Sequence, residues 1–329
     1  MPAAEHIDMV SIILPVYNEA GNLQPLHESL TNALDALDRS TEVIFVDDGS
    51  SDASIKEIES RIDSETTKRS RLIRLRRNYG QTTAFMAGID QAKGGIIVLM
   101  DADRQNDPAD IAKLLEHIEK GYDVVAGWRK ERNDPLLTKC LPSWLANRLI
   151  SFLSGVPMHD YGCSLKAYRR EAISGFRLYG EMHRFIPIYA HWQGAKITEV
   201  PVTHHPRTAG KSNYGLSRTF KVIMDLIVVI FLHEYQQKPM YVFGSAALVS
   251  MIVGGLSGGM AVYYKFFGDK SFIQTPLPLL CVMCFLTAVM CFLMGLLAEL
   301  LIRIYYESQD KRTYNSVDAS DSRDSRIGF

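Results

Sequence analysis

Two aspartates, Asp101 and Asp103, directly follow the apolar run from Ile96 to Met100. Such a run is typical of a buried strand, so both carboxylates should lie at its carboxyl end, where open α/β sheets bind ligands. Carboxylates there could hold Mg²⁺ or Mn²⁺, which proteins usually bind through one or two carboxylates plus substrate phosphates. Alternatively, such a pair caps the next helix, whose start is indicated by Asp107-Pro108.

A second acidic pair, Asp47 and Asp48, follows the apolar run from Val43 to Val46. Either carboxylate could accept hydrogen bonds from a nucleotide base or ribose. The next residues, Gly49 and Ser50, allow a tight turn into a helix that should begin near Asp52. The alternative for this pair is again a plain helix cap.

Short apolar runs alternate with amphipathic stretches along the first half of the chain. This βαβ alternation predicts a mostly parallel sheet covered by helices on both faces. Three of the strands end in acidic or turn-forming residues, including Pro15 to Glu19 after the first, so substrates should gather at one edge. The predicted strands are Val10 to Leu14, Val43 to Val46, Leu72 to Leu75, Ile96 to Met100 and Val124 to Ala126.

Two long stretches in the last third of the chain carry no charge, Pro239 to Tyr264 and Ser271 to Ala298. Each is long enough to cross a bilayer as a helix, which needs about 20 apolar residues. The link Lys265 to Lys270 is short, so the two spans should form a hairpin. The alternative is a pair of buried core helices.

A hairpin puts the N-terminal region and the tail on one side of the membrane. No cleavable signal precedes the first strand, so the cytoplasm is the expected side, and the basic residues flanking the spans have a modest bias in the same direction. Gly254, Gly255, Gly258 and Gly259 form two overlapping G-x-x-x-G patterns, which either hairpin packing or oligomerisation could use.

Composition and missing motifs exclude several classes of function. The net charge of -1 gives no reason to expect a nucleic-acid partner. No G-x-x-x-x-G-K-[ST] loop and no G-x-G-x-x-G after a strand occurs, which argues against a P-loop NTPase and a dinucleotide oxidoreductase. Cys281 and Cys284 have no nearby histidine, so they are expected to pack as small apolar residues.

The order of motifs along the chain resembles the inverting GT-A glycosyltransferases, specifically the polyisoprenyl-phosphate glycosyltransferases related to dolichol-phosphate mannose synthase and bactoprenol glucosyltransferase. The resemblance covers nearly the whole chain. It is carried by the motifs Ile12 to Glu19, Val46 to Ser50, Arg77 to Gln81, Asp101 to Gln105, Asp160 to Cys163 and Arg207 to Ser212.

The resemblance implies roles for residues at the strand ends. The residues that shape the nucleotide-sugar pocket would be Pro15, Tyr17, Glu19 and Asp48, together with Asp101 and Asp103. The metal, Mg²⁺ or Mn²⁺, would be held by Asp101, Asp103 and Gln105.

The acceptor implied by the resemblance is a lipid phosphate, which is largely dianionic at neutral pH because its second pKa is near 6. Such an acceptor needs little help from a base. Asp160 is the expected catalytic residue, to orient the acceptor or stabilise positive charge at the sugar more than to remove a proton; a structural cap is the alternative. The expected phosphate-binding residues are Arg129, Arg132, Arg207, Lys211 and Ser212. A solvated charge run is the alternative for Arg129 and Arg132.

The expected architecture is α/β, with four parts. Residues 1–212 form a GT-A catalytic domain with a Rossmann-like, mostly parallel sheet, and residues 213–238 an amphipathic interfacial helix region; a helix buried against the sheet is the alternative for Leu216 to Leu232. Residues 239–302 form the transmembrane hairpin, with spans at about 239–264 and 273–300, and residues 303–329 a disordered cytoplasmic tail.

The expected reaction is metal-dependent, inverting transfer of a single sugar to polyprenyl phosphate on the cytoplasmic face, with UDP-glucose and undecaprenyl phosphate as the preferred pair. GDP-mannose or another nucleotide sugar is the first alternative. A processive synthase lacks support because no Q-x-x-R-W motif occurs. From another class, a non-catalytic membrane scaffold that binds a nucleotide sugar is the alternative. The resemblance also implies a homo-oligomer, a tetramer.

Overall fold

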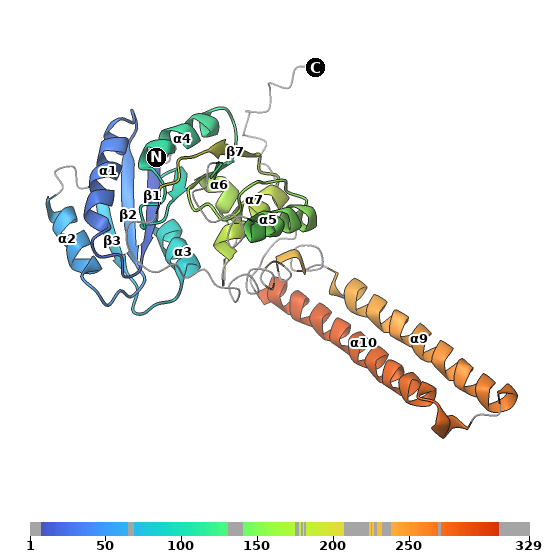
Figure 1. The fold of residues 1–329 in the computed structure, drawn as a ribbon. Coiled ribbons are helices and arrows are strands. Elements are labelled where there is room, and N and C mark those ends of the chain that lie inside the picture. The colour runs from blue at the N-terminus through green and yellow to red at the C-terminus, as the bar shows by residue number, and fades with distance from the viewer. Residues whose placement is uncertain are drawn as a thin grey trace, which may run out of the picture. The chain divides into compact units, whose positions relative to one another are not determined.

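The structure is a computed structural model, and the chain separates into two compact units, Met1–Val228 and Val229–Phe329. The first unit contains a seven-stranded sheet flanked by helices, and the second contains two long helices (Figure 1). The interfacial region expected at 213–238 falls mostly outside the described residues and stays a prediction. The structure describes residues 8–64, 69–130, 141–174, 178, 180, 182–206, 224, 226, 229–231, 238–268 and 271–308.

The sheet is mixed and mostly parallel, with strand order β3-β2-β1-β4-β6-β5-β7. β1 runs parallel to β2 and β4, whereas β6 runs antiparallel to both β4 and β5. The predicted α/β fold is confirmed; β6 and the edge strand β7 were not predicted, because neither has an apolar run. The strands are β1 Val10–Val16, β2 Thr41–Asp47, β3 Ser70–Arg74, β4 Ile96–Leu99, β5 Val124–Trp128, β6 Lys166–Arg169 and β7 Ile197–Pro201.

Helices with one apolar face cover the sheet. In α1 the leucines at positions 23, 26, 30 and 34 recur at helical spacing and are all buried, as the face of an amphipathic helix should be. They share one core with alternate residues of β1 and with α4. The helices of the first unit are α1 Leu23–Asp35, α2 Ser54–Ser64, α3 Gln81–Gln91, η1 Pro108–Asp110, α4 Ile111–Glu119, α5 Leu141–Ser154, α6 Arg170–Ile173, η3 Met182–Phe185 and α7 Ile186–Trp192.

The turn after β2 depends on a glycine. Gly49 has φ +75°, and a Cβ at this position would lie 2.5 Å from the carbonyl carbon of Arg77 and 2.7 Å from the backbone nitrogen of Asn78. No side chain fits between the two segments. The turn can therefore lie directly against the loop that precedes α3. Asp48, in the turn, accepts hydrogen bonds from the backbone of Tyr79 and Gly80 in that loop.

The second unit consists of α9 Pro239–Phe267, a short turn η4 Phe272–Gln274, and α10 Leu277–Ser308. Within it, Pro239–Phe267 and Leu277–Leu301 are each long and apolar enough to cross a membrane. α10 continues to Ser308, so the boundary expected at 302 falls inside this helix.

One of the two glycine patterns in α9 lies against α10. A Cβ on Gly254 would be 3.1 Å from Cβ of Cys284, and one on Gly258 would be 3.0 Å from Sγ of Cys281, whereas Gly255 and Gly259 have nothing within 4 Å. Small residues therefore allow the two helices to approach closely. The hairpin uses the Gly254 and Gly258 pair, and the two cysteines are the packing residues they were expected to be.

Replacing Gly49 by Ala should lower the free energy of unfolding by about 2 kcal/mol or more, because a strained backbone conformation is combined with a backbone clash. Gly121→Ala is the matched control, since Gly121 has φ +93° but nothing within 4 Å of its added Cβ. The melting temperatures of the two purified variants in detergent provide the comparison. Equal losses would show that the close approach at Gly49 contributes nothing.

Candidate functional site

A cavity of about 280 Å³ lies at the carboxyl ends of the central strands. Loops that follow β1, β2 and β4 contribute to its wall, as expected for an α/β sheet that binds a ligand at this edge. Asp160, the expected catalytic residue, is not among the lining residues, and Arg132, Arg207, Lys211 and Ser212 lie outside the described residues. The expected site residues that do line the cavity are Pro15, Tyr17, Glu19, Asp48, Asp101, Asp103, Gln105 and Arg129.

The end of β1 presents an aromatic ring beside a fixed carboxylate. Tyr17 is 48% exposed, and the next residue, Asn18, has φ +55°. The side chain of Asn18 accepts a hydrogen bond from the backbone of Ser51, and Glu19 accepts one from Asn22. These contacts fix the loop, and the half-exposed Tyr17 ring is available for stacking on a flat ligand.

The two aspartates after β2 have separate structural roles. Asp47 accepts hydrogen bonds from the backbone nitrogens of Gly49 and Ser50, so its carboxylate closes the turn. Asp48 accepts from the nitrogens of Tyr79 at 2.7 Å and Gly80 at 2.9 Å and lines the cavity. Burial raises the pKa of Asp48, although these two hydrogen bonds act in the opposite direction. The cavity-facing aspartate is therefore Asp48.

The carboxylates after β4 concentrate negative charge. Burial and then the adjacent charge of Asp103 raise the pKa of Asp101 to about 6. The amide of Gln81 donates to Asp101 at 2.5 Å, while Asp103 accepts from the backbone nitrogen of Gln105 at 3.1 Å. Asp107, as expected, caps the next turn of helix through the nitrogen of Ala109. The Asp101 and Asp103 pair is thus distinct from the cap.

Asp101 and Asp103 alone supply only part of the ligands that a cation such as Mg²⁺ needs. Among the described residues, no group of three or more His, Cys, Asp or Glu side chains is placed to hold a metal ion. Mg²⁺ and Mn²⁺ need only one or two carboxylates when substrate phosphates and water complete the coordination. The like charges of Asp101 and Asp103 are what such a cation would offset, so these donors fit it together with a phosphate ligand.

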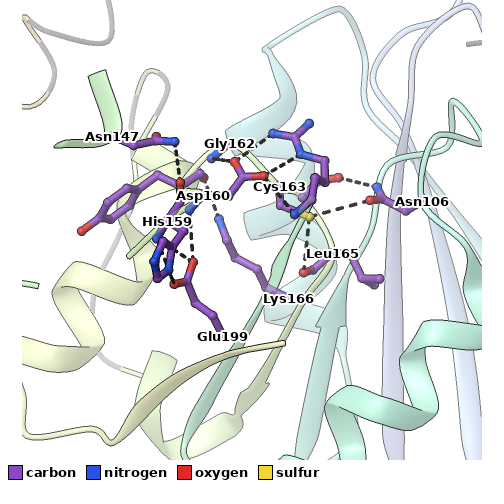
Figure 2. Close-up of polar contacts among 12 residues, drawn as sticks. Asn106, Asn147, His159, Asp160, Gly162, Cys163, Leu165, Lys166 and Glu199 are labelled. Atoms are coloured by element: carbon purple, nitrogen blue, oxygen red, sulfur yellow. Dashed lines mark hydrogen bonds and ion pairs between the residues drawn. The ribbon is translucent and has the colours of Figure 1, made fainter. Parts of the chain in front are cut away.

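Asp160 lies behind the cavity wall in a buried ion pair. Nε and Nη2 of Arg129 donate to its two carboxylate oxygens at 2.7 and 2.9 Å, and the backbone nitrogen of Gly162 donates at 3.0 Å (Figure 2). The two charged side chains are 9% and 4% exposed. This bidentate geometry fixes the guanidinium in one orientation, so Asp160 determines where Arg129 faces the cavity.

Glu199 of β7 supports the segment that carries Asp160. Its carboxylate accepts hydrogen bonds from the backbone nitrogens of His159 and Asp160 and contacts Nδ1 of His159 at 2.8 Å (Figure 2). The ring of Trp128 stacks on His159 with centroids 4.4 Å apart. Edge strand β7 therefore holds the Asp160 loop against β5.

A buried amine lines the same cavity. Lys166 is 3% exposed, and its Nζ donates to the carbonyl oxygen of Tyr161 at 3.0 Å (Figure 2). Burial lowers the pKa of Lys166 to about 8, because the low dielectric disfavours the charged form. An ammonium at this depth is available to an anionic ligand.

Several cavity residues were missed by sequence reasoning. Asn78, Gly80 and Gln81 lie in a motif that carried the resemblance, but no role was assigned to them. The other missed residues are single polar residues in β6, η3 and loops. No motif surrounds them, so the sequence does not indicate that they line a site. His204 lines the cavity and forms an isolated β-bridge with Asn106. The missed lining residues include Asn78, Gly80, Gln81, Asn106, Ser164, Lys166, His183, Arg184 and His204.

This sheet topology, with a carboxylate-lined cavity at its carboxyl edge, is that of a GT-A-type glycosyltransferase. The glycosyl transferase family 2 profile matches residues 11–176, and the chain belongs to this family. The resemblance to polyprenyl-phosphate glycosyltransferases is confirmed by relatives of matching length, and the protein is a glycosyltransferase.

Two relatives and one crystal structure illustrate the similarity. The chain is 40% identical over 311 residues to dodecaprenyl-phosphate galacturonate synthase of Rhizobium johnstonii, covering 93% of this chain and 91% of the relative. It is 35% identical over 314 residues to undecaprenyl-phosphate 4-deoxy-4-formamido-L-arabinose transferase of Enterobacter sp., covering 95% and 94%. Glucosyl-3-phosphoglycerate synthase from Mycobacterium tuberculosis, in complex with Mn²⁺, UDP and phosphoglyceric acid, shares the fold, with a TM-score of 0.51 and 18% identity over 69% of this chain and 78% of that one.

The depressed pKa of Lys166 predicts a pH-dependent stability. The unfolded chain keeps this amine protonated up to about pH 10.4, whereas the folded protein releases the proton near pH 8. Between these values the unfolded state binds more protons, so stability should rise with pH. Lys166→Met should remove this rise. Melting temperatures of both proteins from pH 7.5 to 10 provide the test, and parallel curves would contradict a lowered pKa of Lys166 in the folded protein.

Proposed function

We propose that the protein transfers one sugar from a nucleoside-diphosphate sugar to polyprenyl phosphate, with inversion at the anomeric carbon. The observation that carries the proposal is the convergence of Asp48, Asp101 and Asp103 on one cavity that cations also line, in a chain whose full-length relatives are named for polyprenyl-phosphate sugar transfer.

The donor nucleotide is assigned to the side of the cavity formed by β1 and β2. Asp48 keeps acceptor capacity beyond its two backbone hydrogen bonds, because a carboxylate has about four lone-pair sites. Tyr17 offers a ring face for the base, and Pro15 and Glu19 complete this wall. These assignments rest on the geometry of the loops and on the resemblance.

The donor diphosphate is assigned to the side of Asp101 and Asp103, with Gln105 adjoining them. A bound Mg²⁺ or Mn²⁺ would supply charge neutralisation to the departing diphosphate. The chain's own contribution is to hold the two carboxylates at the end of β4, where the amide of Gln81 orients Asp101.

The acceptor phosphate attacks the anomeric carbon from the face opposite the diphosphate. The new bond joins a phosphate oxygen to this carbon, and the bond from the carbon to the diphosphate oxygen breaks with its electron pair leaving on the diphosphate. A dianionic phosphate has no proton to lose, so no general base is needed. Arg129 is proposed to bind the phosphate, with Arg132, Arg207, Lys211 and Ser212 as further binding residues outside the described part.

Asp160 is proposed to act by orientation. Its carboxylate already accepts hydrogen bonds from Arg129 and Gly162, which favours a role in fixing the phosphate-binding guanidinium over proton removal. Asp160 would therefore orient the acceptor phosphate through Arg129.

The sugar is proposed to be a uronic acid, with galacturonate preferred over the glucose expected from sequence. The 40% identical relative is named for galacturonate, and Lys166 and Arg184 give the cavity cationic groups that suit a sugar carboxylate. UDP-glucose and UDP-linked formamido-arabinose are the competing donors, and GDP-mannose is a more distant one.

The two long apolar helices support a membrane arrangement. α9 and α10 are proposed to span the bilayer as a hairpin, with the catalytic unit and both termini in the cytoplasm. A Cβ added to Gly255 or Gly259 would meet nothing within 4 Å, and this pair is proposed as a contact between copies in a tetramer.

The test is to reconstitute the full chain with undecaprenyl phosphate and Mg²⁺ and to supply a panel of labelled UDP-sugars and GDP-mannose. Label should enter the lipid phase from UDP-galacturonate and not, at equal concentration, from UDP-glucose. Transfer from UDP-glucose alone would show that the transferred sugar is glucose and not galacturonate. Absence of transfer from every donor, with folded protein, would favour the non-catalytic scaffold.

Replacing Asp103 by Asn should lower the transfer rate at least about 100-fold, because a carboxylate that holds a cation against the diphosphate is lost. Thorough chelation of wild-type protein should give a similar loss that Mg²⁺ or Mn²⁺ restores. Asp107→Asn changes the helix cap and the contact of Asp107 with Nε2 of His205, and neither residue lines the cavity. It is the matched control and should stay within about threefold of wild type. Unchanged transfer in Asp103→Asn would refute the metal assignment.

A further inference from the structure

The start of α3 contacts three parts of the site in succession. The backbone nitrogens of residues 79 and 80 donate to Asp48, and the amide of Gln81 donates to Asp101. The next residue, Thr82, is only 2% exposed, and its hydroxyl reaches a third element, η3. Four consecutive residues therefore meet the side assigned to the nucleotide, the side assigned to the diphosphate, and η3.

The contact between α3 and η3 is a buried hydrogen bond. Oγ1 of Thr82 lies 2.7 Å from Nδ1 of His183, which lines the cavity and is 8% exposed. The ring of Phe85, three positions after Thr82, is tilted against the imidazole with centroids 5.9 Å apart. Breaking such a buried bond is costly, because the groups lose this partner without gaining water. One face of α3 therefore fixes the His183 ring.

The helix α3 is in turn held close to the sheet. A Cβ on Gly88 would lie 2.3 Å from Cγ2 of Ile13 in β1, so the absence of a side chain allows this approach. By contrast, η3 has only four residues and the poorer hydrogen-bond geometry of a 3₁₀-helix. The position of η3 therefore depends on its contact with the more rigid α3.

Arg184 follows His183 in η3 and also lines the cavity. A Cβ on Gly162 would lie 3.8 Å from Nη1 of Arg184 and 3.1 Å from Nη2 of Arg129, so both guanidinium groups approach the same glycine. Burial raises the pKa of Asp101, and the nearby charge of Arg184 acts in the opposite direction. Arg184 is therefore near both the carboxylate assigned to the diphosphate and the arginine assigned to the acceptor phosphate.

The reacting sugar must lie where these two sides meet, because its anomeric carbon is bonded to the diphosphate and attacked by the acceptor phosphate. We infer that η3 selects the sugar: Arg184 binds the carboxylate of a uronic acid, and Thr82 is a positioning residue that holds Arg184 in place through His183. Both roles rest on the nucleotide-sugar donor of the proposed function.

Arg184 is better suited than Lys166 to distinguish one sugar from another. Nζ of Lys166 already donates to the carbonyl oxygen of Tyr161, and burial lowers the pKa of this amine to about 8. A guanidinium stays charged and can contact both oxygens of a carboxylate at once. A sugar with a neutral hydroxymethyl group in place of the carboxylate would lose both of these charge-assisted hydrogen bonds.

The first experiment measures donor discrimination by the full chain in lipid nanodiscs with Mg²⁺ and undecaprenyl phosphate. UDP-galacturonate and UDP-galactose differ only at C6, so the ratio of their kcat/KM values reports the carboxylate contact. Arg184→Met should lower this ratio at least about tenfold, because two charge-assisted hydrogen bonds are lost. An unchanged ratio in Arg184→Met, or a wild-type protein without preference for the uronate, would overturn the role of Arg184.

The second experiment tests the positioning role of Thr82. Thr82→Val should lower the same ratio about tenfold, because a small displacement of a binding group is enough to weaken its contact, and should leave the affinity for UDP alone unchanged. Thr82→Ser keeps the hydroxyl and should keep the ratio. Thr83→Val removes an exposed hydroxyl from the neighbouring position and is the matched control.

A hydrogen bond that serves stability alone would give a different pattern. Thr82→Val would then lower the melting temperature and slow transfer from both donors equally, with the ratio unchanged, which would overturn the positioning role. Arg184→Met leaves the buried hydrogen bond in place, so sugar selection stays testable even where Thr82→Val does not fold.

A binding measurement separates sugar selection from the proposed transfer. Calorimetry with Mg²⁺ and without acceptor gives the affinities for UDP-galacturonate and UDP-galactose with no chemical step. Tighter binding of the uronate that depends on Arg184, without transfer from any donor, would refute the transfer and support the selection. Transfer by a wild-type protein that binds and uses both donors equally would support the transfer and overturn the selection.

Discussion

The buried ion pair between Arg129 and Asp160 is the interaction on which the rest of the site depends. The side chains of Arg129 and Asp160 are only 9% and 4% exposed. Each charge is stable there only while it is paired with the other, because an unpaired buried charge is strongly destabilising. The pair joins the end of β5 to the loop before β6, and Glu199 of β7 holds that loop from its other side. The orientation of the cavity-facing guanidinium is therefore a property of three strands together.

The cavity brings like charges together, which a folded protein does only where a ligand or a fixed counter-charge offsets them. Asp101 and Asp103 lie at the end of β4, and burial plus their mutual repulsion raises the pKa of Asp101 to about 6. Lys166 on β6 shows the opposite shift for the same physical reason. Burying the charge of Asp101 or of Lys166 costs free energy, and such shifted groups cluster at functional sites. They suit a ligand that carries phosphates and a sugar.

Two helical regions, one in each unit, expose apolar side chains. α9 and α10 are apolar over lengths that fit a bilayer, and Gly254 and Gly258 let them approach closely within the second unit. In the first unit, α5 has its serines and asparagine inward and its tryptophan, leucines and phenylalanine outward.

The sequence by itself determined the α/β class, the acidic strand ends, the apolar spans and the family, because each depends on local periodicity or on motifs of adjacent residues. The sequence could not decide which of Asp47 and Asp48 faces the cavity, since two adjacent aspartates after a strand look alike in the sequence. Only the close approach of Gly49 to Arg77, which brings the backbone of Tyr79 to Asp48, decides it. Strand β6, with Lys166, and the pairing of Arg129 with Asp160 were decided by tertiary structure, because the partners are far apart in the chain and no apolar run marks them. The outward face of α5 was decided in the same way: helical periodicity defines two faces, but only the surrounding fold determines which of them lies inside.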